Sequence, residues 1–137
     1  MKHQYKTVRM MSLLGLAISV ASFAASAQTV RINDVPPCGA GGPDASAMIA
    51  GTTRGADSTS QSVVLFAYGD QWYVQPYVAA PLTSIGRDGS WRTHTHLGLK
   101  YAALLVEASY DPPSTTFVLP KAGGAVLDVN VVDCGAR

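Results

Sequence analysis

The feature that most constrains the fold is a run of seven residues, 62–68, that is almost entirely apolar and rich in valine and aromatic side chains. This length suits a strand that is buried on both faces or nearly so, and it is short for a helix. Alternating segments at 71–77 and 90–96 each follow a turn signal, Gly69-Asp70 and Asp88-Gly89. No segment has helical periodicity over three turns, so the pattern predicts a β-protein.

Further short strands are expected at 29–33, 47–52, 101–109, 117–120 and 125–132. About seven short strands, spaced by roughly 8–15 residues and separated by turn residues, predict an all-β antiparallel Greek-key β-sandwich. Alternation also predicts which side chains face the core, and we expect Trp72 and Trp91 to pack there or at its rim. In the later strands the expected inward residues are Ala102, Leu104, Val106, Leu127, Val129 and Val131, with Glu107, Asp128 and Asn130 outward.

The N-terminus has the pattern of a secretory signal peptide over residues 1–27. A basic leader precedes the apolar stretch 10–23, and Ala25-Ser26-Ala27 has the small-x-small form of a cleavage site. We therefore expect a single β-sandwich domain over residues 28–137, exported to the periplasm or secreted, with no membrane span in the mature chain.

The charge balance of the expected mature chain argues against nucleic acid as a partner. Removing Lys2, Lys6 and Arg9 lowers the formal net charge by three, from +1 to −2. A nucleic-acid binder needs clustered Lys and Arg to neutralise phosphates, and no such cluster is present.

The two cysteines of the chain, Cys38 and Cys134, lie near the two ends of the expected domain. Their spacing is not that of a CxxC redox or zinc motif, and an oxidising compartment favours disulfide formation. The sequence predicts a Cys38–Cys134 disulfide that ties the first strand region to the last.

One candidate binding surface is the aromatic strand face of Tyr73, Gln75 and Tyr77, which alternation places on one side of segment 71–77. Tyrosine offers an apolar ring with a polar tip, which suits stacking on sugar rings, and an amide between the rings can bind hydroxyls. The alternative is that these tyrosines cover the sheet or pack under a loop, because aromatic residues are common in strands.

A second candidate is the pair His94 and His96, whose spacing on a strand puts both imidazoles on one face, with the Cα atoms about 7 Å apart. Two imidazoles can ligate one Zn²⁺ or Cu²⁺, with a third ligand supplied from elsewhere, such as Glu107 or Asp128. Arg92 shares the expected face and opposes a cation. The alternative is an ordinary solvated strand.

Catalysis is not predicted. No G-x-S-x-G elbow is present, and the aspartates fall mostly in turns, where local backbone hydrogen bonds account for them. No catalytic residue and no cofactor is expected.

The chain resembles the accessory β-sandwich modules, immunoglobulin-like or transthyretin-like, of bacterial secreted and surface proteins, some of which are attached to carbohydrate-active enzymes. The motifs that carry the resemblance are Val64-x-Phe66-x-Tyr68, Trp72-x-x-Gln75-Pro76, Pro81-Leu82-Thr83-x-Ile85, Asp88-Gly89-Ser90-Trp91, Tyr110-Asp111-Pro112-Pro113 and Leu119-Pro120. It spans residues 32–131, and such modules often have Lys where Gln75 stands here.

Together these features predict an exported, non-catalytic binding or interaction module that contacts carbohydrate or cell-envelope glycan through the Tyr73/Gln75/Tyr77 face. The competing hypotheses are an envelope β-sandwich that is structural or binds protein, self-associating through an edge strand, and a periplasmic metal binder through His94 and His96. The sequence predicts no oligomeric state.

Overall fold

The computed structural model describes residues 15–22 and 27–134. Within these residues every regular element is a β-strand, and the strands form two antiparallel sheets. This confirms the all-β prediction and is consistent with a β-sandwich. Most of the predicted signal peptide, including Ala25 and Ser26 of its cleavage motif, lies outside the described residues. Among the described residues no helix is long and apolar enough to cross a membrane.

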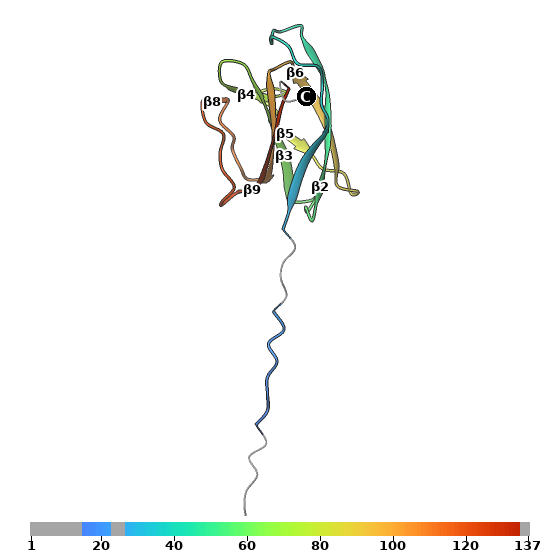
Figure 1. Ribbon diagram of the computed structural model, residues 1–137, viewed down its shortest axis with the longest axis vertical. Helices are drawn as coiled ribbons and strands as arrows, with labels where there is room; N and C mark the ends of the chain where they lie inside the picture. The colour runs from blue at the N-terminus through green and yellow to red at the C-terminus, as the bar shows by residue number, and fades with distance from the viewer. Residues whose placement is uncertain (1–14, 23–26, 135–137) are drawn as a thin grey trace, which may run out of the picture.

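The smaller sheet, sheet A, has the order β1-β2-β6, formed by Thr29–Asp34, Ser46–Arg54 and Ser90–His96. The larger sheet, sheet B, has the order β8-β4-β3-β7-β9, with β5 pairing to β3. Its strands are β3 (Gln61–Tyr68), β4 (Trp72–Gln75), β5 (Leu82–Ser84), β7 (Lys100–Glu107), β8 (Thr115–Thr116) and β9 (Val126–Asp133). Figure 1 shows the two sheets stacked against each other.

Two strands differ from the sequence prediction. The short β5 forms in a segment for which the sequence predicts no strand, because it pairs with the first half of β3 while β4 pairs with the second half. The strand expected at 117–120 is absent, and Thr115–Thr116 pairs with β4 instead. Strands of two or three residues carry too little alternation to be recognised in a sequence.

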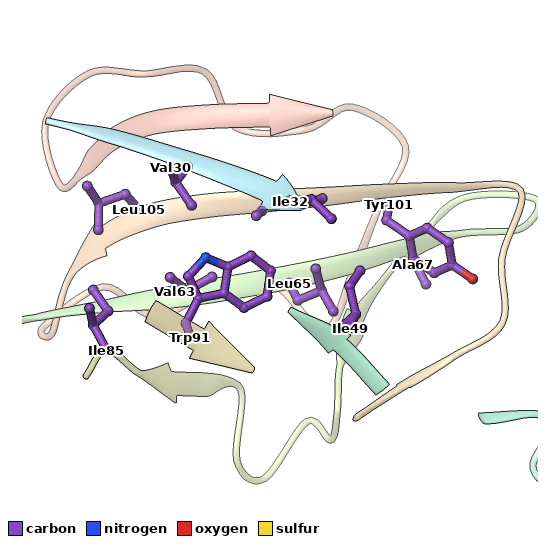
Figure 2. Packing of buried hydrophobic residues seen from close by; sticks show 11 residues of the cluster. Val30, Ile32, Ile49, Val63, Leu65, Ala67, Ile85, Trp91, Tyr101 and Leu105 are labelled. Atoms are coloured by element: carbon purple, nitrogen blue, oxygen red, sulfur yellow. The ribbon is translucent and has the colours of Figure 1, made fainter. Parts of the chain in front are cut away.

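The main hydrophobic core lies between the two sheets. It is built from Val30, Ile32, Ile49, Val63, Leu65, Ala67, Ile85, Trp91, Tyr101, Ala103 and Leu105. Figure 2 shows the Trp91 indole among side chains from both sheets. Gly51 lies opposite Trp91 in the β2–β6 ladder, and a Cβ at Gly51 would run into the indole ring and the backbone oxygen of Arg31. The expectation that Trp72 and Trp91 are packing residues is confirmed, because both are buried.

A second cluster covers the other face of sheet B. Val64, Phe66, Trp72, Val74, Ala102, Leu104, Val106 and Val126 form it, and Tyr110 and Leu119 pack against it. These two side chains belong to segment 108–125, which lies on the side of sheet B away from sheet A (Figure 1). The predicted inward and outward faces of β7 are therefore wrong: both faces are buried, with Ala102, Leu104 and Val106 on the face away from sheet A. Glu107 is half-exposed because it ends the strand.

In β9 Leu127 packs against the main core as predicted, but the inward and outward assignment of residues 128–131 is wrong. Asp128 Oδ2 accepts a hydrogen bond from the backbone N–H of Val30 at 2.9 Å, and Asn130 Oδ1 accepts one from Ile32 at 2.9 Å. Both side chains thus face β1 of sheet A, while Val131 is 46% exposed. The cause is a bulge: the register shifts between Leu105 and Val106, so that Leu127 is an extra residue and the alternation of β9 changes side.

The Cys38–Cys134 disulfide is present, as predicted, with a Cα–Cα distance of 5.7 Å and a sequence separation of 96 residues. Asp128 and Asn130 join β9 to β1 along the seam between these two strands. The disulfide joins the same seam beyond the ends of the strands. In the chain-entropy account, a bridge across a loop of this size stabilises the folded state by ~4–5 kcal/mol.

Candidate functional site

A cleft of about 730 Å³ lies where the β4 edge of sheet B meets the end of β6 in sheet A. Tyr73, Gln75 and Tyr77 all line it, together with His96. The remaining wall includes loop residues 41–43, the turn after β3, Leu97, and Ser114 with Thr115 at the start of β8. The two surfaces that the sequence suggested separately therefore meet in one place.

Tyr73 is held in a fixed orientation on the cleft wall. Its hydroxyl donates a 2.6 Å hydrogen bond to Asp70 Oδ1, and 39% of the residue is exposed. This hydrogen bond lowers the pKa of Asp70 below its usual 3.8, so the carboxylate is charged at neutral pH. The ring is therefore oriented before any ligand binds, so binding loses less side-chain entropy.

Tyr77 lies at the start of a tight turn that follows β4. β4 ends at Gln75 because Pro76 has no N–H to donate to a ladder. The backbone N–H of Ala80 donates to Tyr77 O at 3.1 Å and closes the turn. Tyr77 is 64% exposed, and Val78 next to it is also exposed. The turn thus presents an aromatic ring and a valine to solvent at the rim of the cleft.

Gln75 has a different role from the two tyrosines. It is only 3% exposed, and its Oε1 accepts a hydrogen bond from the His96 backbone N–H at 2.8 Å. The same oxygen lies 3.0 Å from His96 Nδ1. Its Nε2 donates to Tyr73 O at 3.3 Å. The amide therefore joins sheet B to sheet A below the cleft, and its hydrogen-bonding groups are occupied inside the protein.

The loop that borders the cleft is held by close backbone contacts. The Leu97 N–H donates to Ala45 O at 2.8 Å, and the Leu99 N–H donates to Tyr68 O at 2.9 Å. Gly98 permits this approach, since a Cβ at that position would lie 2.8 Å from Tyr68 O. The cleft wall on this side is therefore built from backbone whose position is fixed by the end of β3.

His94 and His96 line a smaller hollow of about 320 Å³, which shares Gln75, Pro76 and Tyr77 with the cleft. His94 is exposed and His96 is half-buried. The suggested third ligands lie elsewhere: Glu107 is beside Gln61, and Asp128 bonds the Val30 N–H. Within residues 15–22 and 27–134, no group of three or more His, Cys, Asp or Glu side chains is placed to hold a metal.

Two features of the site were not apparent in the sequence. The Gly-rich loop at 41–43 gave no signal beyond its composition, because its contact with Leu97 is set by the disulfide and the backbone bonds around it. The link between Gln75 and His96 joins residues 21 positions apart on different sheets, which no local pattern reveals.

No protein-family model, curated protein or solved structure matches this chain.

Proposed function

We propose that this protein is an exported, non-catalytic binding module that takes an uncharged sugar or glycan segment in the Tyr73/Tyr77 cleft. The observation that carries the proposal is the presence of two exposed tyrosine rings, 39% and 64% accessible, on the wall of one cleft of about 730 Å³. A cleft of this volume is in the range of small-ligand sites.

The chemistry of the wall suits a polyhydroxylated ligand. Tyrosine rings offer flat apolar faces for the C–H groups of a sugar and hydroxyls for its polar edge. Ser114 and Thr115 add hydroxyls on the β8 side, and the loop at Gly41 and Gly42 adds backbone groups. Because the Gln75 amide oxygen is bonded to His96, we expect the two tyrosines rather than this amide to contact the ligand.

The charge of the wall favours a neutral ligand over an acidic one. No Lys or Arg is among the described residues that line the cleft, and Asp70 contributes a negative charge. A phosphate or uronate would meet that carboxylate without a fixed cation to pair with it. Neutral polysaccharides are therefore the expected class of ligand.

The test is retention of the folded protein on insoluble neutral polysaccharides. We expect Tyr77→Ala to weaken binding about tenfold, corresponding to the loss of one stacked ring. Phe117→Ala is the matched control, because Phe117 is 79% exposed but does not line the cleft. No retention of the wild-type protein on any neutral polysaccharide, or equal retention of wild type and Tyr77→Ala, would overturn the proposal.

We also propose that the protein is exported and that its strands have Greek-key connections. The folded domain begins directly after the predicted cleavage point: Gln28 Nε2 donates to Gly55 O at 2.8 Å, and β1 starts at Thr29. The disulfide supports export, because disulfides form and persist in oxidising compartments. We infer a signal peptide over 1–27, a periplasmic or secreted location, and Greek-key connections of the immunoglobulin or transthyretin type. Protein recovered from the exported fraction should begin at Gln28 by intact mass.

A second candidate, self-association of two copies, is favoured by the outer edge of β6. The His96 N–H points away from β2 to Gln75, and Ser90 O accepts from Gly86 N at 2.7 Å on the same side. By alternation, the backbone groups of Arg92 and His94 also face away from β2, and within the described residues no hydrogen bond outside the ladder uses them. Such an edge accepts another strand.

Molar mass in solution tests this second candidate. We expect dimers at high concentration for the wild type and monomers for Arg92→Pro, which removes an outward N–H without removing a hydrogen bond of the β2–β6 ladder. A wild-type protein that is monomeric at every concentration would contradict it.

A further inference from the structure

Three residues that can ligate a soft metal occupy neighbouring positions on the outer face of sheet A. His94 and His96 are on β6, and Met48 is on β2 directly opposite His94 in the ladder. Residues opposite each other in an antiparallel pair project from the same face, as do residues two apart on one strand. Met48 is half-buried and His94 is exposed, so the group is open to solvent on one side.

The spacing of these side chains is set by the backbone pattern. Because the His96 N–H leaves β2 and bonds Gln75, the pairs Ser46–His96 and Met48–His94 are of the closely spaced kind without mutual backbone bonds. Their Cβ atoms therefore lie about 4.5–5.5 Å apart across the strands, and His94 and His96 lie about 7 Å apart along β6. Methionine has three rotatable bonds, so its sulfur can reach an ion held between the imidazoles.

His96 is already arranged as a metal ligand. Gln75 Oε1 can only accept, so its 3.0 Å contact with His96 Nδ1 requires the proton to be on Nδ1. Nε2 then carries the free lone pair. Ligating histidines in metal sites are commonly oriented in this way, by a hydrogen bond from the other ring nitrogen. The buried position of Gln75 keeps this arrangement fixed without a metal.

The charges around the group select among metals. The three side chains are neutral ligands, and no carboxylate joins them among the described residues. Arg92 precedes His94 by two positions on the same strand and adds a positive charge to the same face. Ca²⁺ and Mg²⁺ need oxygen ligands, and a nearby guanidinium repels a divalent ion more strongly than a monovalent one. A thioether with two imidazoles favours Cu(I).

We propose that Met48, His94 and His96 form a Cu(I)-binding site on the outer face of sheet A. The site adjoins the Tyr73/Tyr77 cleft, because His96 also lines that cleft and Tyr77 lines the hollow beside His94 and His96. One copper ion binds per chain, and the protein can therefore carry or sequester copper.

The experiment is competition for Cu(I) between the folded protein and a coloured chelator, without oxygen and with ascorbate as the reductant. We expect one equivalent to bind, His94→Ala and His96→Ala each to abolish binding, and Met48→Leu to weaken it at least tenfold. Met48→Leu is close in volume, so folding is retained. Arg92→Ala is the electrostatic control and should bind Cu(I) more tightly.

Zn²⁺ titration separates the proposed site from a simple pair of surface histidines. A thioether adds little to Zn²⁺ affinity, so Met48→Leu should leave that affinity unchanged while it weakens Cu(I). Equal Cu(I) affinity in wild type and Met48→Leu would overturn the three-ligand site, as would Cu(I) binding that survives in His94→Ala. Neither result depends on whether the cleft binds sugar.

Discussion

Gln75 of sheet B and His96 of sheet A are joined by a single amide oxygen, which lies 2.8 Å from the His96 backbone nitrogen and 3.0 Å from its Nδ1. This contact closes the gap between the sheets at the floor of the cleft. It also aligns the end of β6 with β4, so the two candidate sites depend on the same residue.

Replacing Gln75 should therefore destabilise the protein as well as disturb the site. In Gln75→Leu the His96 N–H loses its acceptor, and an unsatisfied buried donor costs about 1–3 kcal/mol. Urea unfolding should show a loss of that size. Gln71→Leu, a change of the same chemistry in the neighbouring turn, serves as the control and should be nearly neutral. An unchanged midpoint for Gln75→Leu would show that the contact adds nothing.

The β1–β9 seam makes a second prediction. Asn130→Ala removes the acceptor of the part-buried Ile32 N–H and should cost about 1–2 kcal/mol, because that donor then loses its hydrogen bond. Hydrogen exchange offers a local readout: the Ile32 amide should exchange faster in the variant, while amides in the centre of β3 change only with global stability. Equal protection of Ile32 in both proteins would contradict the role given to Asn130.

Gly51 is predicted to be intolerant of any side chain. A Cβ there would collide with the Trp91 ring, which is buried in the core, and with the Arg31 carbonyl oxygen of the paired strand β1. Gly51→Ala should lower the free energy of unfolding by about 1–3 kcal/mol or more. Gly42→Ala is the matched change, because nothing lies within 4 Å of a Cβ at Gly42. A Gly51→Ala protein as stable as Gly42→Ala would refute the packing described for Trp91.

Acid should destabilise the protein through its turn aspartates. Hydrogen bonds from Thr59 lower the pKa of Asp57, and hydrogen bonds from Ser90 lower the pKa of Asp88, both from the usual 3.8. A lowered folded-state pKa gives stability that is present above the unfolded value and is lost as pH falls through the folded one. The urea midpoint should thus be level above about pH 5 and fall toward about pH 3.

The variant Asp57→Asn with Asp88→Asn tests that assignment. Its midpoint should depend less steeply on pH over the same acid range, because two of the titrating carboxylates are gone. An acid dependence as steep as that of the wild type would place the cause in other groups.

The sequence predicted the parts of the structure that rest on local patterns. The apolar run of β3, the turn at Asp88-Gly89 and the pairing of the only two cysteines all follow from residue type and spacing, and each is found. The second buried face of β7 was missed because no local pattern shows that segment 108–125 folds back over that face and places Tyr110 and Leu119 against it. Alternation alone cannot show what covers a strand.

The candidate site was predictable only in its components. Tyr73 and Tyr77 were found by alternation, and His94 and His96 by their spacing. Their meeting at one cleft depends on how β4 of one sheet lies against β6 of the other, which is a tertiary relationship. The side-chain bonds of Asp128 and Asn130 to β1 were missed for a related reason, since a single bulged residue, Leu127, reverses the faces of β9.

The proposal that the cleft binds a neutral glycan is tested most directly by NMR titration of the folded protein with soluble neutral oligosaccharides. The account predicts saturable chemical-shift changes centred on Tyr73, Tyr77 and Val78, with little change at Phe117 on the far segment. An absence of shifts with every neutral oligosaccharide, or shifts that centre away from β4 and the turn after it, would contradict it.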